Sequence, residues 1–328
     1  MTVVLGVLTS CVKALIYHER GSMAAALFSA INQGVLWGVM VLGVYITYKL
    51  LNIADLSVDG TFALGGCVAA TAMVTGGMDP WLAVLLAFLA GAVAGGCTGL
   101  MHALLNIPAI LAGILTMIGL WSVNLRIMGK SNTPLLNTRT IYSDVADLTG
   151  LPRDVVVLLV AVAIAAALVG LLYWFFGTEV GSSLRATGDN PDMAKALGVD
   201  TRFTILLALM LSNGLVSMSG ALVCQSQKYA DVGMGTGAIV IGLAAIVIGE
   251  ALGRLTPGKL RSFGSRLIAA VVGSAAYFLI RAIVLQLGLD ANDMKLLTAL
   301  IVVIALGIPY LAGRVKQRSS YQREGVDD

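Results

Sequence analysis

Two aspartates are the residues in this sequence whose type and spacing best suit chemistry. Asp55 and Asp59 lie in the stretch Asn-Ile-Ala-Asp-Leu-Ser-Val-Asp-Gly-Thr over residues 52–61, at the start of a long apolar run. They are four residues apart, so one face of a helix would carry both. Two interpretations stay open. The pair could cap the N-terminus of the helix that follows, which acidic residues and Ser57 favour, or it could face a translocation path or a partner.

Asp59 is expected to matter more than Asp55, because residues 58–70 are otherwise free of charge and Asp55 would lie nearer the cytoplasmic water. Asp59 would then face the path or hold a basic partner that keeps an inner gate shut. Asn124 and Asn213 are further candidates, since a polar side chain is penalised where it faces lipid. Either asparagine could instead be an interhelical hydrogen-bond partner. The sequence thus predicts a pathway that includes Asp59, Asn124 and Asn213.

Catalytic and metal-binding arrangements are missing from the sequence. The four cysteines are scattered singly and the two histidines have no ligand spacing, so a zinc site, an iron–sulfur cluster and a disulfide framework are not expected. Residues 253–260 have the spacing of a phosphate-binding loop, but Leu260 stands where a Ser or Thr must hold Mg²⁺. We therefore expect a chain that is not an enzyme and binds no cofactor or metal of its own.

The composition places these residues in a membrane protein. The chain has 328 residues, of which 58% are hydrophobic and only 12% charged, about half the charge of a soluble domain. A soluble enzyme, a secreted disulfide scaffold and a disordered chain are excluded. A net charge of +3 does not suggest binding to nucleic acid. Many of the 38 glycines form small-xxx-small faces, such as Gly91, Gly95 and Gly99, which suit close helix packing.

The sequence predicts an all-α, polytopic bundle of about nine or ten transmembrane helices. Gly, Pro and polar clusters separate nine apolar runs near 23–48, 57–77, 80–103, 108–128, 153–176, 203–225, 236–252, 264–287 and 295–313. Residues 1–22 are an N-terminal extension or an extra helix, residues 23–313 the transmembrane domain, and residues 314–328 a basic tail.

Lysine and arginine in the short loops indicate the orientation. With the C-terminus in the cytoplasm, 12 of the 21 basic residues fall inside and seven outside. This puts the loop 177–202 in the cytoplasm. Within it, Asn190 before Pro191 is a helix start and Gly198 a stop, and Ala194, Leu197 and Val199 give an apolar side. A loop that forms its own helix is expected to dock onto something soluble.

The same loop resembles a known signature. Its run from Arg185 through Ala186, Gly188, Asn190, Ala194 and Gly198 is similar to the R-A-x-G-x-N-x-x-A-x-x-x-G motif of bacterial ABC importer permeases. The relevant branch serves branched-chain amino acids, ribose-type sugars and nucleosides. Residues 52–65 resemble the second-span motif of a subgroup linked to amino acids, including tryptophan-type systems, and residues 211–222 the span after the coupling loop. The resemblance covers roughly residues 25–312.

This resemblance implies the fold of a type II importer permease in a bacterial cytoplasmic (inner) membrane. Two copies, or a pair of homologues, would form the pathway for a small polar solute, for which the subgroup motif favours an amino acid. A separate ATPase would bind ATP and Mg²⁺, and a solute-binding protein would deliver substrate from outside. The residues implied in coupling to the ATPase are Glu179, Arg185, Ala186, Gly188, Asp189, Asn190, Ala194 and Gly198.

Two alternatives to an importer permease fit the sequence less well. A secondary transporter or channel without an ATPase would share the bundle, but no relay of Asp, Glu and His runs through the apolar runs, as an ion-coupled transporter would need. A membrane enzyme would need a catalytic constellation that the sequence does not contain.

Overall fold

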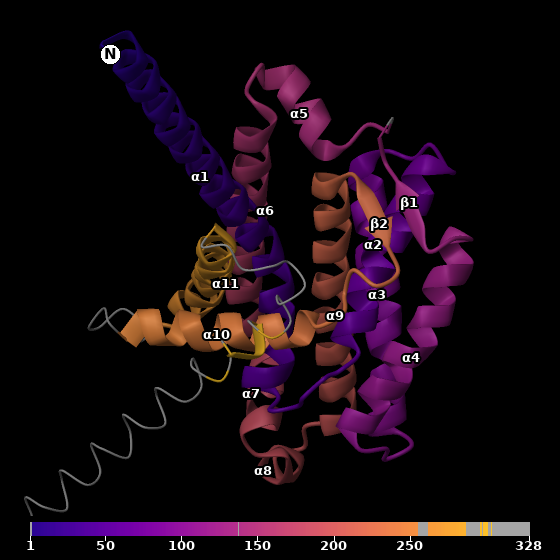
Figure 1. The fold of residues 1–328 in the computed structure, drawn as a ribbon. Coiled ribbons are helices and arrows are strands. Elements are labelled where there is room, and N and C mark those ends of the chain that lie inside the picture. Colours follow the sequence, from indigo (N-terminus) through magenta and orange to yellow (C-terminus); the bar gives the residue numbers. More distant parts are fainter. Residues whose placement is uncertain are drawn as a thin grey trace, which may run out of the picture.

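The computed structural model describes residues 2–136, 138–254, 262–286, 296, 298–300 and 303, and for residues 2–22 and 254 only the backbone. Among these residues the fold is all-helical apart from one small β-sheet, as the sequence predicts (Figure 1). The elements run in the order α1 (Thr2–Tyr45), a π-helical turn (Ile46–Leu50), α2 (Val58–Val74), α3 (Pro80–Ala103), α4 (Ala109–Met128), β1 (Asn132–Pro134), α5 (Ile141–Thr149), α6 (Arg153–Gly177), α7 (Glu179–Asp189), α8 (Pro191–Ala196), α9 (Thr201–Gln227), β2 (Tyr229–Asp231), α10 (Ala238–Arg254) and α11 (Phe263–Gln286).

Within the described part of the chain, six segments are long and apolar enough to cross a membrane: Met23–Leu50, α3, α4, α6, α9 and α11. They coincide with six of the nine predicted runs, and the predicted helix boundaries hold. Asp79 accepts a hydrogen bond from the backbone N of Trp81 at 2.9 Å, with Pro80 in the first turn of α3. Gly129 ends α4 in the left-handed conformation that favours glycine.

Helices α2 and α10 are shorter than the full crossings that the sequence predicts at these places. Each has 17 residues, about 26 Å at the rise of an α-helix, against a hydrocarbon core of about 30 Å. Both are helices where the sequence predicts them, but the first turn of α2 is already buried among other helices, and α10 lies across the upright helices in Figure 1. Each is therefore a short helix inside the bundle.

Two predicted parts of the chain lie near its ends, residues 1–22 and the region from residue 295 onward. Residues 2–22 continue α1 without a break, and the predicted domain boundary after residue 22 stays a prediction. The ninth apolar run, 295–313, lies mostly outside the described residues, and the predicted basic tail, 314–328, lies wholly outside them.

Helix α9 is the centre of the bundle, packed against α3, α2 and α1, while α10 and α11 pack on one another and on α1. The predicted small-residue face of α3 lies against α9: a Cβ on Gly95 would collide with the carbonyl oxygen of Leu209. Such an approach brings backbone close to backbone over several turns, which is how helices associate without a hydrophobic driving force between them.

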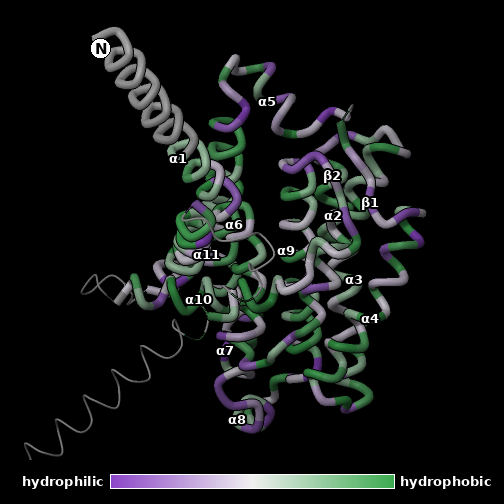
Figure 2. Tube along the Cα trace, in the orientation of Figure 1, coloured by the Kyte–Doolittle hydropathy of each residue, from purple (hydrophilic) through white to green (hydrophobic). Residues whose placement is uncertain are grey.

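Hydrophilic residues collect at the two ends of the helices, around α5 and around α8, with hydrophobic residues between (Figure 2). At the α5 end, the connection between α4 and α6 contains β1, which pairs antiparallel with β2, Thr133 opposite Ala230. Tyr142 of α5 is buried and its hydroxyl donates to the carbonyl of Leu222 at 3.2 Å; burial raises the pKa of this phenol. The α5 end is thus an ordered cap on the bundle.

Candidate functional site

Asp55 lies in the irregular segment that precedes α2, and only 2% of its surface is exposed. Its Oδ1 accepts from the backbone N of Ser57 at 2.9 Å and from the Ser57 hydroxyl at 2.6 Å. Its Oδ2 accepts from Asn213 Nδ2 at 2.7 Å. The Asp55 side chain therefore has almost no contact with water: it is sealed among neutral donors of its own segment and α9.

Asp59 lies one turn further on and joins two helices. Its Oδ2 accepts from the backbone N of Gly237 at 2.8 Å, and its Oδ1 from the backbone N of Ile239 at 2.9 Å. These are N–H groups at the start of α10, where a helix carries a partial positive charge. Asp59 therefore caps α10 and not α2, which corrects the interpretation that it caps the helix that follows it. The partners of its carboxylate are backbone amides, whereas the interpretation as a gate allowed a basic side chain.

A cavity of about 430 Å³ opens beside Asp59, between α2, α4 and the segment that connects β2 to α10. It is lined by Asp59, Gly60, Met117, Ile118, Trp121, Ser122, Asn124, Val232 and Thr236. We call it the Asp59 pocket. The Trp121 side chain is half exposed on the α4 side, so one wall of the pocket is a large aromatic ring.

Asn124 lines the Asp59 pocket with an unsatisfied acceptor. The residue is 1% exposed; its Nδ2 donates to the carbonyl of Gly60 at 3.3 Å, and its Oδ1 has no hydrogen-bond partner among the described residues. A buried acceptor without a partner is costly. The pocket thus presents the Asp59 carboxylate to a bound donor, while the Asn124 amide oxygen is buried behind its wall.

Asn213 is not part of this pocket. It is fully buried on α9, where Nδ2 donates to Asp55 and also to the carbonyl of Leu209 at 3.1 Å, and Oδ1 lies 3.1 Å from the Ser57 hydroxyl. This is the interhelical hydrogen-bond position that the sequence left open as an alternative.

The loop 177–202 forms two short helices, α7 and α8, of which α8 is the helix that its sequence predicts. Asn190 caps α8, its Oδ1 accepting from the backbone N of Met193 at 3.0 Å, and Pro191 is the first helical residue. Gly198 has a φ of +85° and ends the element. The predicted apolar side is only partly right, since Ala194 is buried but Leu197 is 70% exposed.

The residues implied in coupling divide into two groups. Glu179, Ala186, Asp189, Asn190 and Gly198 are exposed at the surface of α7 and α8. Arg185 is half-buried and turns back to the bundle, donating from Nη2 to the carbonyl of Phe176 at 2.8 Å. Gly188 is packed so closely on the segment before α2 that a Cβ would meet the carbonyl oxygen of Leu50.

One segment of chain links these helices to the Asp59 pocket. It begins with the π-helical turn Ile46–Leu50, on which α7 packs through Gly188, and it ends at Asp59. Asn52 within it has a φ of +55°, which is uncommon for a residue other than glycine. π-Helical turns such as Ile46–Leu50 often mark functional sites. Lys49 pairs with Glu250 of α10 at 2.8 Å. We call residues 46–59 the connecting segment.

Sequence reasoning missed several residues of these sites. Trp121 and Thr236 line the pocket, and the exposed apolar side chains of Met193 and Leu197 mark the surface of α8. The sequence does hold a signal for the pocket residues, the glycine-rich run over residues 233–237 just before a short apolar run. Paired short or glycine-interrupted segments point to binding sites in transporters.

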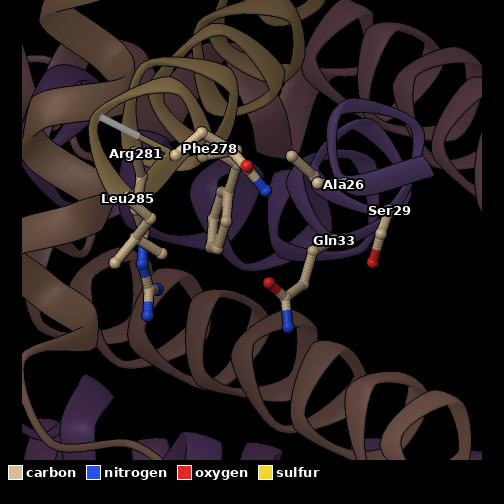
Figure 3. Close-up of a pocket in the computed structure, with 9 residues that line it drawn as sticks. Ala26, Ser29, Gln33, Phe278, Arg281 and Leu285 are labelled. Carbon is tan, nitrogen blue, oxygen red and sulfur yellow. The ribbon is translucent and has the colours of Figure 1, made fainter. Parts of the chain in front are cut away.

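A smaller cavity of about 230 Å³ lies between α1 and α11. Arg281 of α11 and Gln33 of α1 reach toward the same side of it, with Phe278 between them (Figure 3). The guanidinium of Arg281 stands 5.7 Å from the Phe278 ring centre. None of the residues predicted for the pathway or the coupling element lines this cavity.

Comparison with known proteins gives one consistent result. A family model described as "Branched-chain amino acid transport system / permease component" matches residues 26–306. The chain is 38% identical to the tyrosine transport system permease protein of Clostridioides difficile, over 86% of this chain and 90% of that protein. It is 28% identical to a probable branched-chain amino acid transport permease protein, LivH, of Methanocaldococcus jannaschii, over 72% and 78%, and 25% identical to the ribose import permease protein RbsC of Escherichia coli, over 85% and 84%. No solved structure matches.

Proposed function

Because the chain belongs to the family of branched-chain amino acid transport permeases, the membrane components of ATP-binding-cassette importers, we propose that it carries an amino acid with an aromatic side chain through the Asp59 pocket. The chain is a multi-pass inner-membrane permease and not itself catalytic. ATP hydrolysis belongs to an ATPase partner, and a solute-binding protein delivers the substrate.

The carboxylate of the Asp59 pocket carries this proposal. An amino acid brings an ammonium group, which has three donors and a positive charge, and the Asp59 carboxylate offers it an acceptor and a negative charge. A ribose-type sugar has no positive charge with which to match a carboxylate. Trp121 supplies an aromatic face to the side chain, and the 38% identical relative is named for tyrosine transport.

A second permease copy or a homologue is proposed to close the pocket. The α4 side chains at its mouth, Ile118 and Trp121, are each more than half exposed, and α4 is among the least buried of the long helices. A twofold arrangement that brings two α4 helices toward one axis would place both Asp59 pockets on a shared pathway, with lipid around the remaining helices.

The ATPase is proposed to dock on α7 and α8. The exposed group Glu179, Ala186, Asp189, Asn190 and Gly198 would provide the polar part of the contact and Leu197 with Met193 the apolar part. Movement of α7 would then reach the pathway through Gly188, Leu50 and the connecting segment, which ends at Asp59.

Uptake into reconstituted vesicles tests the proposal. Vesicles would contain the permease with its ATPase, enclose ATP, and receive the binding protein from outside together with radiolabelled tyrosine, leucine or ribose. We expect ATP-dependent accumulation of tyrosine above leucine, and none of ribose. Accumulation of ribose but not of amino acids would contradict the substrate class, and uptake without ATP would favour a transporter that needs no ATPase.

A further inference from the structure

A second cavity, of about 450 Å³, lies at the α7 end of the molecule and takes no part in the proposed pathway. Its walls include Tyr173, Trp174 and Phe176 of α6, Arg185 of α7 and Phe263 of α11. We call it the Arg185 cavity. It combines one guanidinium with several aromatic rings, a composition that the importer mechanism does not by itself require.

The guanidinium of Arg185 has unused hydrogen-bonding capacity. It has five N–H donors; Nη2 donates to the carbonyl of Phe176, while the buried Nε has no partner among the described residues. The Arg185 guanidinium carbon stands 5.7 Å from the ring centre of Phe263. The C-terminal carbonyls of α6 offset only part of its charge, so a positively charged group lines the cavity.

No carboxylate neutralises this charge within the part of the chain that the structure describes, where the ion pair recorded at this end joins Lys49 to Glu250. The Arg185 guanidinium that lines the cavity is therefore not in an ion pair with any described carboxylate, which suits an anionic ligand.

The cavity mouth lies at a membrane surface. Helix α6 is the most hydrophobic of the six candidate spans and among the least buried in the bundle, so most of it faces lipid. Trp174 is 70% exposed and Tyr173 is 55% exposed near its end. Tyrosine and tryptophan concentrate at the level of the lipid headgroups, and the basic residues of the loops put this end on the cytoplasmic side.

We propose that the Arg185 cavity binds the phosphate group of an anionic phospholipid of the cytoplasmic leaflet. Phosphate oxygens accept charge-assisted hydrogen bonds from a guanidinium fork, and basic pockets between helices on the cytoplasmic side suit anionic headgroups. Tyr173 and Trp174 contact the glycerol region, and the acyl chains continue along α6. A free phosphate ion offers the same chemistry to Arg185 but leaves the aromatic wall and the apolar helix without a role.

Native mass spectrometry of the full-length chain tests this site. The protein would be purified in detergent and titrated with phosphatidylglycerol or phosphatidylcholine, for wild type, Arg185→Gln and Arg202→Gln. Arg202 is the matched control, because it is an exposed arginine at the same end that does not line the cavity. We expect wild type to bind phosphatidylglycerol at least about tenfold more tightly than phosphatidylcholine, Arg185→Gln to lose that preference, and Arg202→Gln to keep it. A tenfold change corresponds to about one charge-assisted hydrogen bond.

Three results would overturn the proposal: equal binding of both lipids by wild type, an unchanged preference in Arg185→Gln, or an equal loss in Arg202→Gln. Displacement of the lipid by millimolar inorganic phosphate would instead identify a free-phosphate site. If Arg185→Gln does not fold, Trp174→Leu on the exposed surface of α6 serves in its place and is expected to weaken binding severalfold; a Trp174→Leu variant that binds like wild type would contradict the site. None of these readouts depends on transport.

Discussion

Asp55 and Asp59 are four residues apart, but the backbone gives them different surroundings. Helix α2 begins at Val58, so Asp55 lies outside the helix and the rule that residues four apart share a face does not apply to it. Asp55 joins the connecting segment to α9 through Asn213, and Asp59 joins α2 to the start of α10. The sequence singles out both carboxylates, but it cannot predict which of them is buried, because burial depends on where a neighbouring helix begins.

Replacing Asp59 with Asn is expected to reduce uptake at normal expression. The Asn side chain keeps one acceptor where the carboxylate has two, so one of the bonds to the N–H groups of Gly237 and Ile239 is lost, at about 1 kcal/mol, together with the charge offered to an ammonium group. We expect at least about a tenfold lower rate of amino-acid uptake in reconstituted vesicles. Equal rates for wild type and Asp59→Asn would leave Asp59 with a capping role alone.

Replacing Asp55 with Asn is expected to lower stability more than the same change at Asp59. Asp55 is buried and accepts from Ser57 and Asn213; an amide in its place would put a donor against the Asn213 amide, and an unmatched buried donor costs about 1–3 kcal/mol. Thermal unfolding of the purified chain, followed by size-exclusion fluorescence, would measure the difference. If Asp59→Asn unfolds at the lower temperature, this ranking of the two carboxylates is wrong.

At the scale of elements, the position of each helix along the sequence could be predicted much better than how deeply it lies inside the bundle. The eight apolar runs that lie within the described residues are all helices, because composition and boundary residues such as Pro80 and Gly129 specify them locally. That α2 and α10 begin inside the bundle depends on contacts between distant segments, which a pattern along one segment does not contain. The same reason explains why Leu197, which has the spacing of a core residue, is exposed at the end of a short helix.

The contact between α7 and the connecting segment gives a prediction about coupling. A side chain at Gly188 must push α7 away from the carbonyl of Leu50, and such overpacking costs about 1–3 kcal/mol. Gly188→Val should therefore leave ATP hydrolysis in the assembled transporter but separate it from uptake. The measurement is the ratio of ATP hydrolysed to substrate accumulated in vesicles, which we expect to rise at least severalfold.

Gly177→Ala is the matched control for this change, because a Cβ on Gly177, at the neighbouring end of α6, has open space around it. It should leave the ratio of hydrolysis to uptake unchanged. A ratio that does not move in Gly188→Val, or that moves equally in both variants, would show that α7 does not act on the pathway through Leu50.

At the scale of the whole molecule, the surface of α8 needs an explanation that this chain alone does not provide. Leu197 and Met193 are 70% and 60% exposed at an end of the bundle that is otherwise hydrophilic, where α7 and α8 extend beyond the spans (Figure 1). Apolar side chains exposed to water at a hydrophilic surface are typical of a protein–protein contact. They fit the ATPase partner of an importer permease, whereas the lipid-facing leucines of α6 are explained by the membrane itself.

Leu197→Asp is accordingly expected to separate the permease from its ATPase. Burying a leucine side chain on docking contributes about 1.5–3 kcal/mol, so its replacement by a charge should weaken association by at least about tenfold, measured as ATPase retained on the affinity-purified permease. Leu148→Asp is the control, because Leu148 is 86% exposed on α5 at the opposite end and its charge would face the binding-protein side. ATPase retention should fall for Leu197→Asp and not for Leu148→Asp. If retention falls equally in both, the loss reflects general damage to the bundle, and if it falls in neither, the ATPase docks elsewhere than on α8.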